Sequence, residues 1–148
     1  MPVLAAKGKT LEFKAGLTIS ETAIGSSGSC ALIFAVTGSG YATSLGPVTF
    51  TSTDCVNPGV DGTLTFTSTN VSLKVAGGDT LTGSYDGTAT PQPAPFMGIR
   101  GDVTFDGGSG RFMNASGAAT IDGVEVITFT PPSGAGTLFI SGSITLPK

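Results

Sequence analysis

The chain has 148 residues, a formal net charge of −3 and a positive mean hydropathy of +0.31, which together predict one folded domain rather than intrinsic disorder. Seven Lys and Arg against ten Asp and Glu leave no basic surface for nucleic acid, and no apolar run is long enough for a membrane-spanning helix. Histidine is absent, which excludes Ser-His-Asp and Cys-His catalysis and every His-ligated metal site, so we expect no cofactor, no metal and no recognisable catalytic residue.

Alternating apolar and polar residues predict strands in the first half of the chain. Between Leu11 and Ile19 the odd-numbered residues are apolar, which is the pattern of a half-buried strand. Residues 30–36 are apolar on both faces and predict a deeply buried strand. Residues 48–53 and 64–69 are near copies separated by Asn-Pro-Gly and Asp-Gly turn signals, so they predict two further strands.

The alternation continues over residues 71–75 and resumes over residues 80–90, where Leu81 and Tyr85 share one face. Residues 90–95 contain three prolines, which cannot donate to a strand ladder, so this segment predicts a connection at one end of the fold.

Four strands are predicted in the remainder, over residues 99–105, 115–121, 124–130 and 137–146. A glycine cluster follows the first of them, and Asp122-Gly123 reads as a hairpin turn between the second and the third.

No window has sustained helical spacing, and the connections between eight to ten predicted strands are short. Short connections join neighbouring antiparallel strands, which favours an all-β, eight-stranded up-and-down barrel. An Ig-like sandwich of the pilin or adhesin kind is the alternative. We expect residues 1–9 to be a flexible N-terminus or a cloning remnant, and residues 10–148 to form a single barrel domain.

The two cysteines, Cys30 and Cys55, indicate the cellular compartment. If they lie directly opposite each other in a hairpin, its turn falls near Ala42-Thr43 and their Cα atoms come within disulfide reach. Two unpaired core thiols are the alternative. A disulfide implies an oxidising compartment, so we expect a periplasmic, cell-surface or extracellular protein. Residues 1–7 do not resemble a signal peptide, so the export signal would already have been removed.

The segment Gly107-Gly108-Ser109-Gly110-Arg111-Phe112 is the most specific stretch of the chain. Its glycines permit a close turn with positive φ, after which Phe112 returns the chain to the core. A phosphate loop lacks its Gly-Lys-Ser/Thr, a calcium nonapeptide would repeat, and a nucleophile elbow fails because Arg111 replaces its last glycine. We therefore interpret this segment as a structural turn.

This segment, continued by Ala115 and Gly117, resembles a hairpin of plant dirigent proteins and the related turn of allene oxide cyclases. It is more similar to a G-G-T-G-R-F stretch in a broad group of uncharacterised exported bacterial proteins, a similarity that spans roughly residues 10–146. The resemblance implies an eight-stranded antiparallel barrel of the allene oxide cyclase/dirigent type with an apolar cavity. Plant members are often trimeric, so a homo-oligomer is a further implication. No catalytic residue is transferred by the resemblance.

Four residues are candidates for lining such a cavity. Glu21 continues the apolar face that ends at Ile19, so it would point inward near a barrel mouth unless a bulge or the strand end turns it to solvent, which is the outcome we favour. Arg100 is a base near a strand end that could pair with an inward Glu21. Tyr41 and Tyr85 could direct hydroxyls inward, although amphipathic wall positions suit them better.

Two other acidic residues receive no role at this stage. Glu125 shares the parity of Ile127 but directly follows the predicted turn Asp122-Gly123, so we expect it at a wet strand end. Asp54 stands beside predicted turn residues, where aspartate usually bonds its own backbone.

Two classes of function remain, and we prefer the first. It is a non-enzymatic exported barrel, either structural or holding a small apolar ligand or a partner. The second is a cofactor-free barrel of the dirigent or cyclase kind, which folds a reactive apolar substrate into one geometry by shape and exclusion of water. A filled interior would end the second reading, whereas a cavity of roughly 300 Å³ or more containing Glu21 or a tyrosine would favour it.

Overall fold

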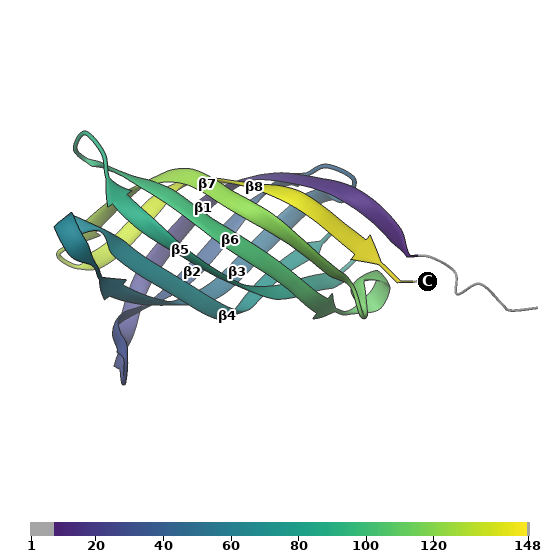
Figure 1. Ribbon diagram of the computed structural model, residues 1–148, viewed down its shortest axis with the longest axis horizontal. Helices are drawn as coiled ribbons and strands as arrows, with labels where there is room; N and C mark the ends of the chain where they lie inside the picture. Colours follow the sequence, from purple (N-terminus) through teal and green to yellow (C-terminus); the bar gives the residue numbers. More distant parts are fainter. Residues whose placement is uncertain (1–7, 148) are drawn as a thin grey trace, which may run out of the picture.

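A computed structural model describes residues 8–147 and shows one closed barrel of eight antiparallel strands (Figure 1). The strands are β1 (Lys9–Ser27), β2 (Cys30–Ala42), β3 (Gly46–Pro58), β4 (Leu64–Val75), β5 (Thr80–Pro91), β6 (Phe96–Gly108), β7 (Ser116–Phe129) and β8 (Pro132–Leu146), with short 3-10 turns η1 (Val60–Gly62) and η2 (Gly110–Phe112). Each strand pairs with the next, and β8 pairs with β1 from Lys9↔Leu146 to Thr22↔Ser133. The up-and-down barrel prediction is confirmed, and the sandwich alternative is wrong.

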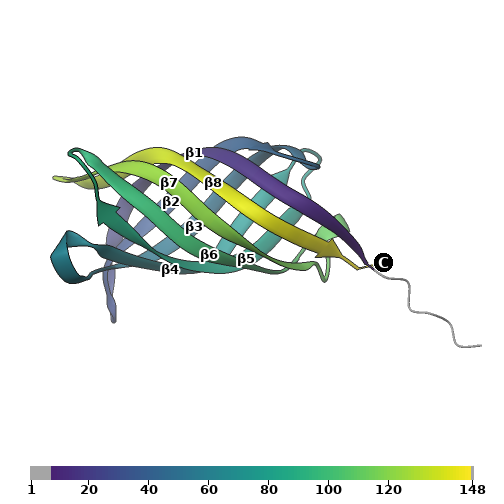
Figure 2. The ribbon, with the colours of Figure 1, turned by 45° about the horizontal axis from the view of Figure 1, so that its top comes forward.

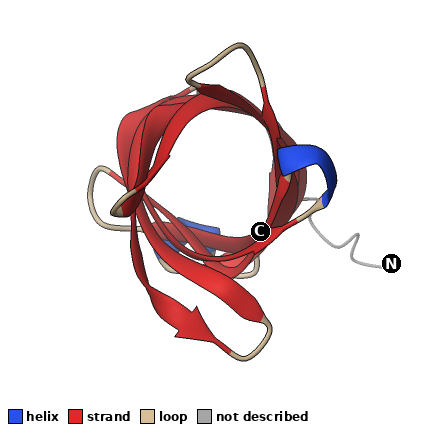
Figure 3. Ribbon diagram, turned by 90° about the vertical axis from the view of Figure 1, so that its left-hand side faces the viewer, coloured by secondary structure: helices blue, strands red, loops and turns tan. Residues whose placement is uncertain are grey.

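The strands are tilted relative to the barrel axis (Figure 2), and the view along the axis shows a complete ring (Figure 3). Closure leaves no free sheet edge between β1 and β8, which protects such Thr-rich strands from edge-to-edge association. The predicted N-terminal segment 1–9 lies outside the described residues except for Gly8 and Lys9, where β1 begins. Within residues 8–147 there is no helix long and apolar enough to span a membrane.

The end of the barrel that carries the chain termini is filled by side chains, and we call it the closed end. Phe13 and Phe105 meet edge to face there, with ring centroids 5.6 Å apart. Phe112 is completely buried. Four connections lie at the opposite end, which we call the cavity end: β1–β2, β3–β4, β5–β6 and β7–β8.

The glycine-rich segment forms the β6–β7 connection at the closed end. Gly110 has a φ of 59°, and a Cβ there would lie 2.0 Å from the Asp79 carboxylate, so only glycine fits. The Arg111 backbone N–H donates to Asp79 at 3.3 Å, and the Arg111 guanidinium lies 5.0 Å from the centroid of the Phe112 ring. Gly107 and Gly108 end β6, and the whole segment acts as a turn that inserts Phe112 into the core.

Asp122-Gly123 is not a hairpin turn, contrary to the prediction. Both residues lie inside the single strand β7. A Cβ at Gly123 would lie 2.4 Å from the carbonyl oxygen of Thr137, so this glycine allows β7 and β8 to approach closely. The two strands predicted on either side of it are therefore one.

Cys30 and Cys55 form a disulfide, with their Cα atoms 5.1 Å apart. The assumed register was wrong, because Cys55 lies opposite Ile33 and the hairpin turns around Ser44. The disulfide instead joins the β1–β2 hairpin, which projects from the cavity end in Figure 1, to the wall strand β3. This bond indicates an oxidising compartment.

Candidate functional site

A cavity of about 40 Å³ lies inside the barrel toward the cavity end. The atom-free space around it, including solvent at its mouth, is about 520 Å³. Its walls are mostly aliphatic and aromatic, but four polar side chains share the space: Glu21, Asp54, Tyr85 and Glu125. The volume is below the range expected of a small-molecule pocket, whereas the polar lining is unusual for a filled core.

Asp54 is the centre of a hydrogen-bonded group on one side of the cavity. Its carboxylate accepts a bond from the Tyr85 hydroxyl and another, at 2.9 Å, from Ser52 Oγ. The Tyr85 ring is fixed by Phe50, stacked at 6.3 Å, and by Phe66, edge-on at 5.5 Å. These contacts hold the hydroxyl and the carboxylate in one geometry without bound ligand.

Glu21 and Glu125 both line the other side of the cavity, close enough that each carboxyl shifts the pKa of the other. They come from β1 and β7, which flank β8. Glu21 lies opposite Gly134 and Glu125 opposite Gly136. A Cβ at Gly134 would lie 2.8 Å from Glu21 Oε1, whereas one at Gly136 would lie 2.1 Å from the backbone carbonyl oxygen of Val124 and 2.8 Å from Glu125 Cγ. Gly134 thus leaves space for the Glu21 carboxyl, and Gly136 allows β8 to approach β7 closely beside Glu125.

Basic side chains do not balance this acidic group. Every Lys and Arg among residues 8–147 is exposed, and none lines the cavity. Burying a carboxylate without a cation is costly, so the group retains its proton instead. The three carboxyl groups of the cavity therefore have raised pKa values.

The three carboxyl groups differ in acidity. Burial, followed by the charges of Glu125 and Asp54, raises the pKa of Glu21 to about 8. Burial raises the pKa of Glu125 to about 7, although the nearby carboxyl of Glu21 lowers it. Burial also raises the pKa of Asp54 to about 6, while the bonds from Tyr85 and Ser52 lower it. The pair of Glu21 and Glu125 therefore holds a proton more strongly than Asp54 does.

Tyr85 does not supply a charge to this site. Burial and the neighbouring Asp54 raise the pKa of its hydroxyl well above the ordinary value. The hydroxyl is therefore a hydrogen-bond donor at every pH at which the barrel is expected to work.

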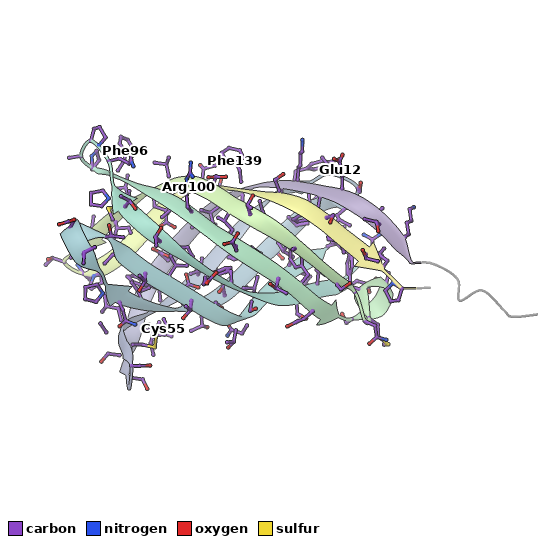
Figure 4. The ribbon with its side chains drawn as sticks, viewed as in Figure 1. Glu12, Cys55, Phe96, Arg100 and Phe139 are labelled. Atoms are coloured by element: carbon purple, nitrogen blue, oxygen red, sulfur yellow. A yellow bond between two sulfur atoms is a disulfide. The ribbon has the colours of Figure 1, made fainter. Side chains whose placement is uncertain are left out.

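Glu21 and Tyr85 lie where a ligand-cavity role requires them, but the other two sequence candidates do not. The β1 register shifts only after Ala23, so the bulge comes too late to turn Glu21 to solvent, and the outcome we favoured is wrong. Tyr41 is 63% exposed. Arg100 lies on the outer wall (Figure 4), where its Nε is 3.5 Å from Asp122 Oδ1. Both predictions of a cavity position are corrected, because these side chains fall on the outward parity of β2 and β6.

Asp54 and Glu125 were missed, although each is only 6% exposed. Asp54 shares the inward face of β3 with Phe50 and Val56, so alternation carried through Val56 would have found it. Glu125 was assigned to a wet strand end only because Asp122-Gly123 was interpreted as a turn. Among residues 8–147 no group of three acidic, Cys or His side chains is arranged to hold a metal ion.

Comparison with solved structures finds the same barrel in the pterocarpan synthase dirigent protein GePTS1, with a TM-score of 0.59 and 13% identity, over 100% of this chain and 94% of that chain. The barrel is dirigent-like. At this identity the likeness concerns the fold alone. No family model matches the sequence, and no curated protein matches it. The resemblance inferred from the sequence is confirmed for the barrel and not for a sequence family or motif.

Proposed function

We propose that the protein binds a small, largely apolar molecule at the cavity end and acts on it by acid–base chemistry without a cofactor. The observation that carries this proposal is the group Glu21, Asp54 and Glu125, three carboxyls that line the cavity without a basic partner; Asp54 and Glu125 are buried and Glu21 is half-buried. Such a group lowers stability, so a purely structural barrel has no reason to keep it. Perturbed carboxyls in a cavity are typical of functional sites.

The size of the cavity determines how a ligand would lie. About 40 Å³ admits a hydroxyl or carbonyl group but no ring system. The apolar body of the ligand would occupy the mouth against Leu64, Phe66 and Ile127, while its polar group reaches the carboxyls. A largely apolar molecule with one or two oxygen substituents satisfies both requirements.

The division of protons suggests a reaction class. Glu21, protonated at neutral pH, can donate a proton to an oxygen of the ligand, and ionised Asp54 can accept one from a second position. One proton enters the ligand and one leaves it, so cyclisation or isomerisation proceeds without a redox partner. The fold is shared with a protein described as a pterocarpan synthase dirigent protein, which supports chemistry on a small molecule in this kind of barrel.

The second candidate is the non-enzymatic barrel preferred from the sequence, which binds a small molecule or serves only a structural role. The observation that favours it is the small cavity, about 40 Å³. In that case the carboxyls are hydrogen-bonding anchors and no proton moves during binding.

We also infer that the protein is exported to the periplasm, the cell surface or the medium. The disulfide supports an oxidising compartment. Two predictions from the resemblance remain predictions. One is membership of the exported bacterial group with the G-G-[TS]-G-R-F stretch, and the other is association of copies into a homo-oligomer.

The test begins with protein purified from its own source, because native mass spectrometry then reveals a retained small molecule directly. That molecule is incubated with the protein, and the products are analysed by liquid chromatography and mass spectrometry. We expect conversion by the wild type and a loss of at least tenfold in rate for Glu21→Gln and Asp54→Asn. Glu12→Gln is the matched control, since Glu12 is exposed on the same strand as Glu21 (Figure 4).

Binding without conversion would select the second candidate. To detect binding independently of the natural ligand, the neutral apolar fluorophore N-phenyl-1-naphthylamine is titrated into the protein. Failure of the fluorophore to bind, together with no retained molecule, would overturn ligand binding in both candidates and leave only the structural role.

A further inference from the structure

The backbone ladder between β3 and β4 is interrupted beside Asp54. Regular pairing stops at Thr51↔Ser72 and resumes at Cys55↔Thr67. Between these pairs the backbone N–H of Thr53 donates to the side-chain oxygen of Asn70 at 2.9 Å instead of to a carbonyl of β4. The wall is thus closed at this point by side chains rather than by the strand ladder.

The inner side of this interruption carries a chain of hydroxyl groups. Ser52 Oγ is 2.9 Å from Asp54 Oδ1 and 2.7 Å from Ser68 Oγ, and Ser68 Oγ is 2.9 Å from Asn70 Oδ1. Both serines are almost fully buried, at 5% and 4% exposed. A hydroxyl has one proton, so Ser52 donates either to Asp54 or to Ser68 at any moment. Two alternative donor directions are what a proton relay requires.

The outer side of the interruption is a shallow groove of about 180 Å³, large enough for water. Cys55, labelled in Figure 4, lies at this groove, together with Thr53 and Thr67. Asp54 and Ser68 also line it, and Asp54 lines the inner cavity as well. The hydroxyl chain therefore lies between two spaces that water can reach.

We propose that Ser52 and Ser68 relay protons through the barrel wall between Asp54 in the cavity and water in the outer groove. Asp54 passes its proton to Ser52 Oγ while the proton of Ser52 moves to Ser68 Oγ. The Ser68 hydroxyl, which donates to Asn70 Oδ1 at rest, turns and gives its proton to water in the groove. One proton leaves Asp54, and each serine gives up one proton and gains another, so both serines end as neutral hydroxyls. The same transfers in the opposite direction return a proton to Asp54. The other titratable groups facing Asp54 are Tyr85, Glu21 and Glu125, and all of them lie on the cavity side.

Such a relay has a use in the proposed function, on which its biological meaning rests. A ligand that fills the mouth isolates Asp54 from solvent on the cavity side. The relay restores the protonation state of Asp54 while the ligand is still bound. Ser52 and Ser68 act through Asp54, so they are positioning and relay residues rather than catalytic ones.

The test uses a probe that fills the mouth rather than the natural ligand, so it can fail or succeed separately from the proposed chemistry. At pH 5, where the cavity carboxyls are protonated, the protein with N-phenyl-1-naphthylamine bound at the mouth is mixed rapidly into D₂O, and the C=O bands of the carboxylic acids are followed by infrared spectroscopy. The Asp54 band is assigned by its loss in Asp54→Asn. We expect Ser68→Ala to slow the deuteration of Asp54 at least tenfold and to leave the Glu21 and Glu125 bands unchanged.

Two further variants separate the relay from a packing effect. Ser68→Thr retains the hydroxyl and should keep rapid exchange, and Ser143→Ala on β8 makes the same chemical change away from the interruption. If Ser68→Ala does not fold, Ser52→Ala replaces it, with slow exchange and an Asp54 titration midpoint above about 6 expected. Equal exchange of Asp54 in the wild type and the folded relay variant would overturn the proposal.

Discussion

Glu21 and Glu125 lie on strands that flank β8, and β8 has glycine opposite each of them: Gly134 opposite Glu21 and Gly136 opposite Glu125. Both glycines lie within β8 and neither has a positive φ, so neither is needed for a turn. A Cβ at Gly134 would lie 2.8 Å from Glu21 Oε1, whereas one at Gly136 would first meet the backbone oxygen of Val124 at 2.1 Å. Gly134 thus leaves space for the Glu21 carboxyl, and Gly136 allows β8 to approach β7 closely.

Gly134→Ala should separate the pair without unfolding the barrel. The new methyl group would meet the flexible end of Glu21, with Oε1 at 2.8 Å, rather than backbone. We expect Glu21 to move toward the mouth and its pKa to fall from about 8 toward the ordinary range, because both burial and the contact with Glu125 diminish. Carboxyl ¹³C NMR titration measures this shift. Gly16→Ala is the control, since its Cβ would meet nothing closer than Phe139 at 3.7 Å, and an unshifted Glu21 in Gly134→Ala would contradict the explanation.

The barrel should be more stable in acid than in mild alkali. Because the folded-state pKa values of the buried carboxyls are raised, the folded protein binds more protons than the unfolded chain, and stability falls as pH rises from about 4 to about 8. Asp54 alone, raised from 3.8 to about 6, corresponds to about 3 kcal/mol. Urea unfolding at pH 5 and pH 8 measures the difference.

The same measurement on Asp54→Asn isolates that residue. The variant should lose part of the pH dependence and gain stability relative to wild type at pH 8, because the amide carries no charge to bury. Asp86→Asn, an exposed position on β5, should leave the pH dependence unchanged. A wild type equally stable at both pH values would contradict the raised pKa values.

Removing the disulfide by Cys30→Ser and Cys55→Ser should lower the free energy of unfolding by about 3.5 kcal/mol, the chain-entropy value for a separation of 25 residues. The loss should be the same at pH 5 and pH 8, because neither cysteine titrates. Denaturant titration under non-reducing conditions tests this, and a loss confined to one pH would show that the bond instead supports the acidic cavity.

Phe112→Ala should destabilise the barrel by about 3–5 kcal/mol, since a completely buried aromatic side chain leaves a void in the closed end. Met113→Ala is the neighbouring control, because Met113 is 61% exposed and its loss should cost little. Thermal and urea unfolding compare the two variants. Similar losses would mean that the glycine-rich turn does not deliver Phe112 to the core as described.

The sequence by itself determined the strands and their closure. Period-two alternation placed Phe13 and Leu17 on one apolar face, and glycine and proline marked most of the connections. It did not place Tyr85 inside, since a wall position was preferred for a side chain that is in fact buried. It failed at Gly123, because glycine signals both a turn and a close approach of strands, and only the neighbouring backbone distinguishes the two. The disulfide was found from cysteine content, although the register assumed for it was three residues out of place.

The tertiary structure alone decided the site. Alternation assigns a residue to a face, but Glu21, Asp54 and Glu125 converge only because strand tilt and register bring three distant strands to the same depth of one cylinder. The acidity of a carboxyl depends on how much water and charge surround it, which is a sum over neighbours that are remote in the chain. A local sequence pattern predicts the direction in which each side chain points. The acidity of that side chain is set by the neighbouring residues that the fold brings around it.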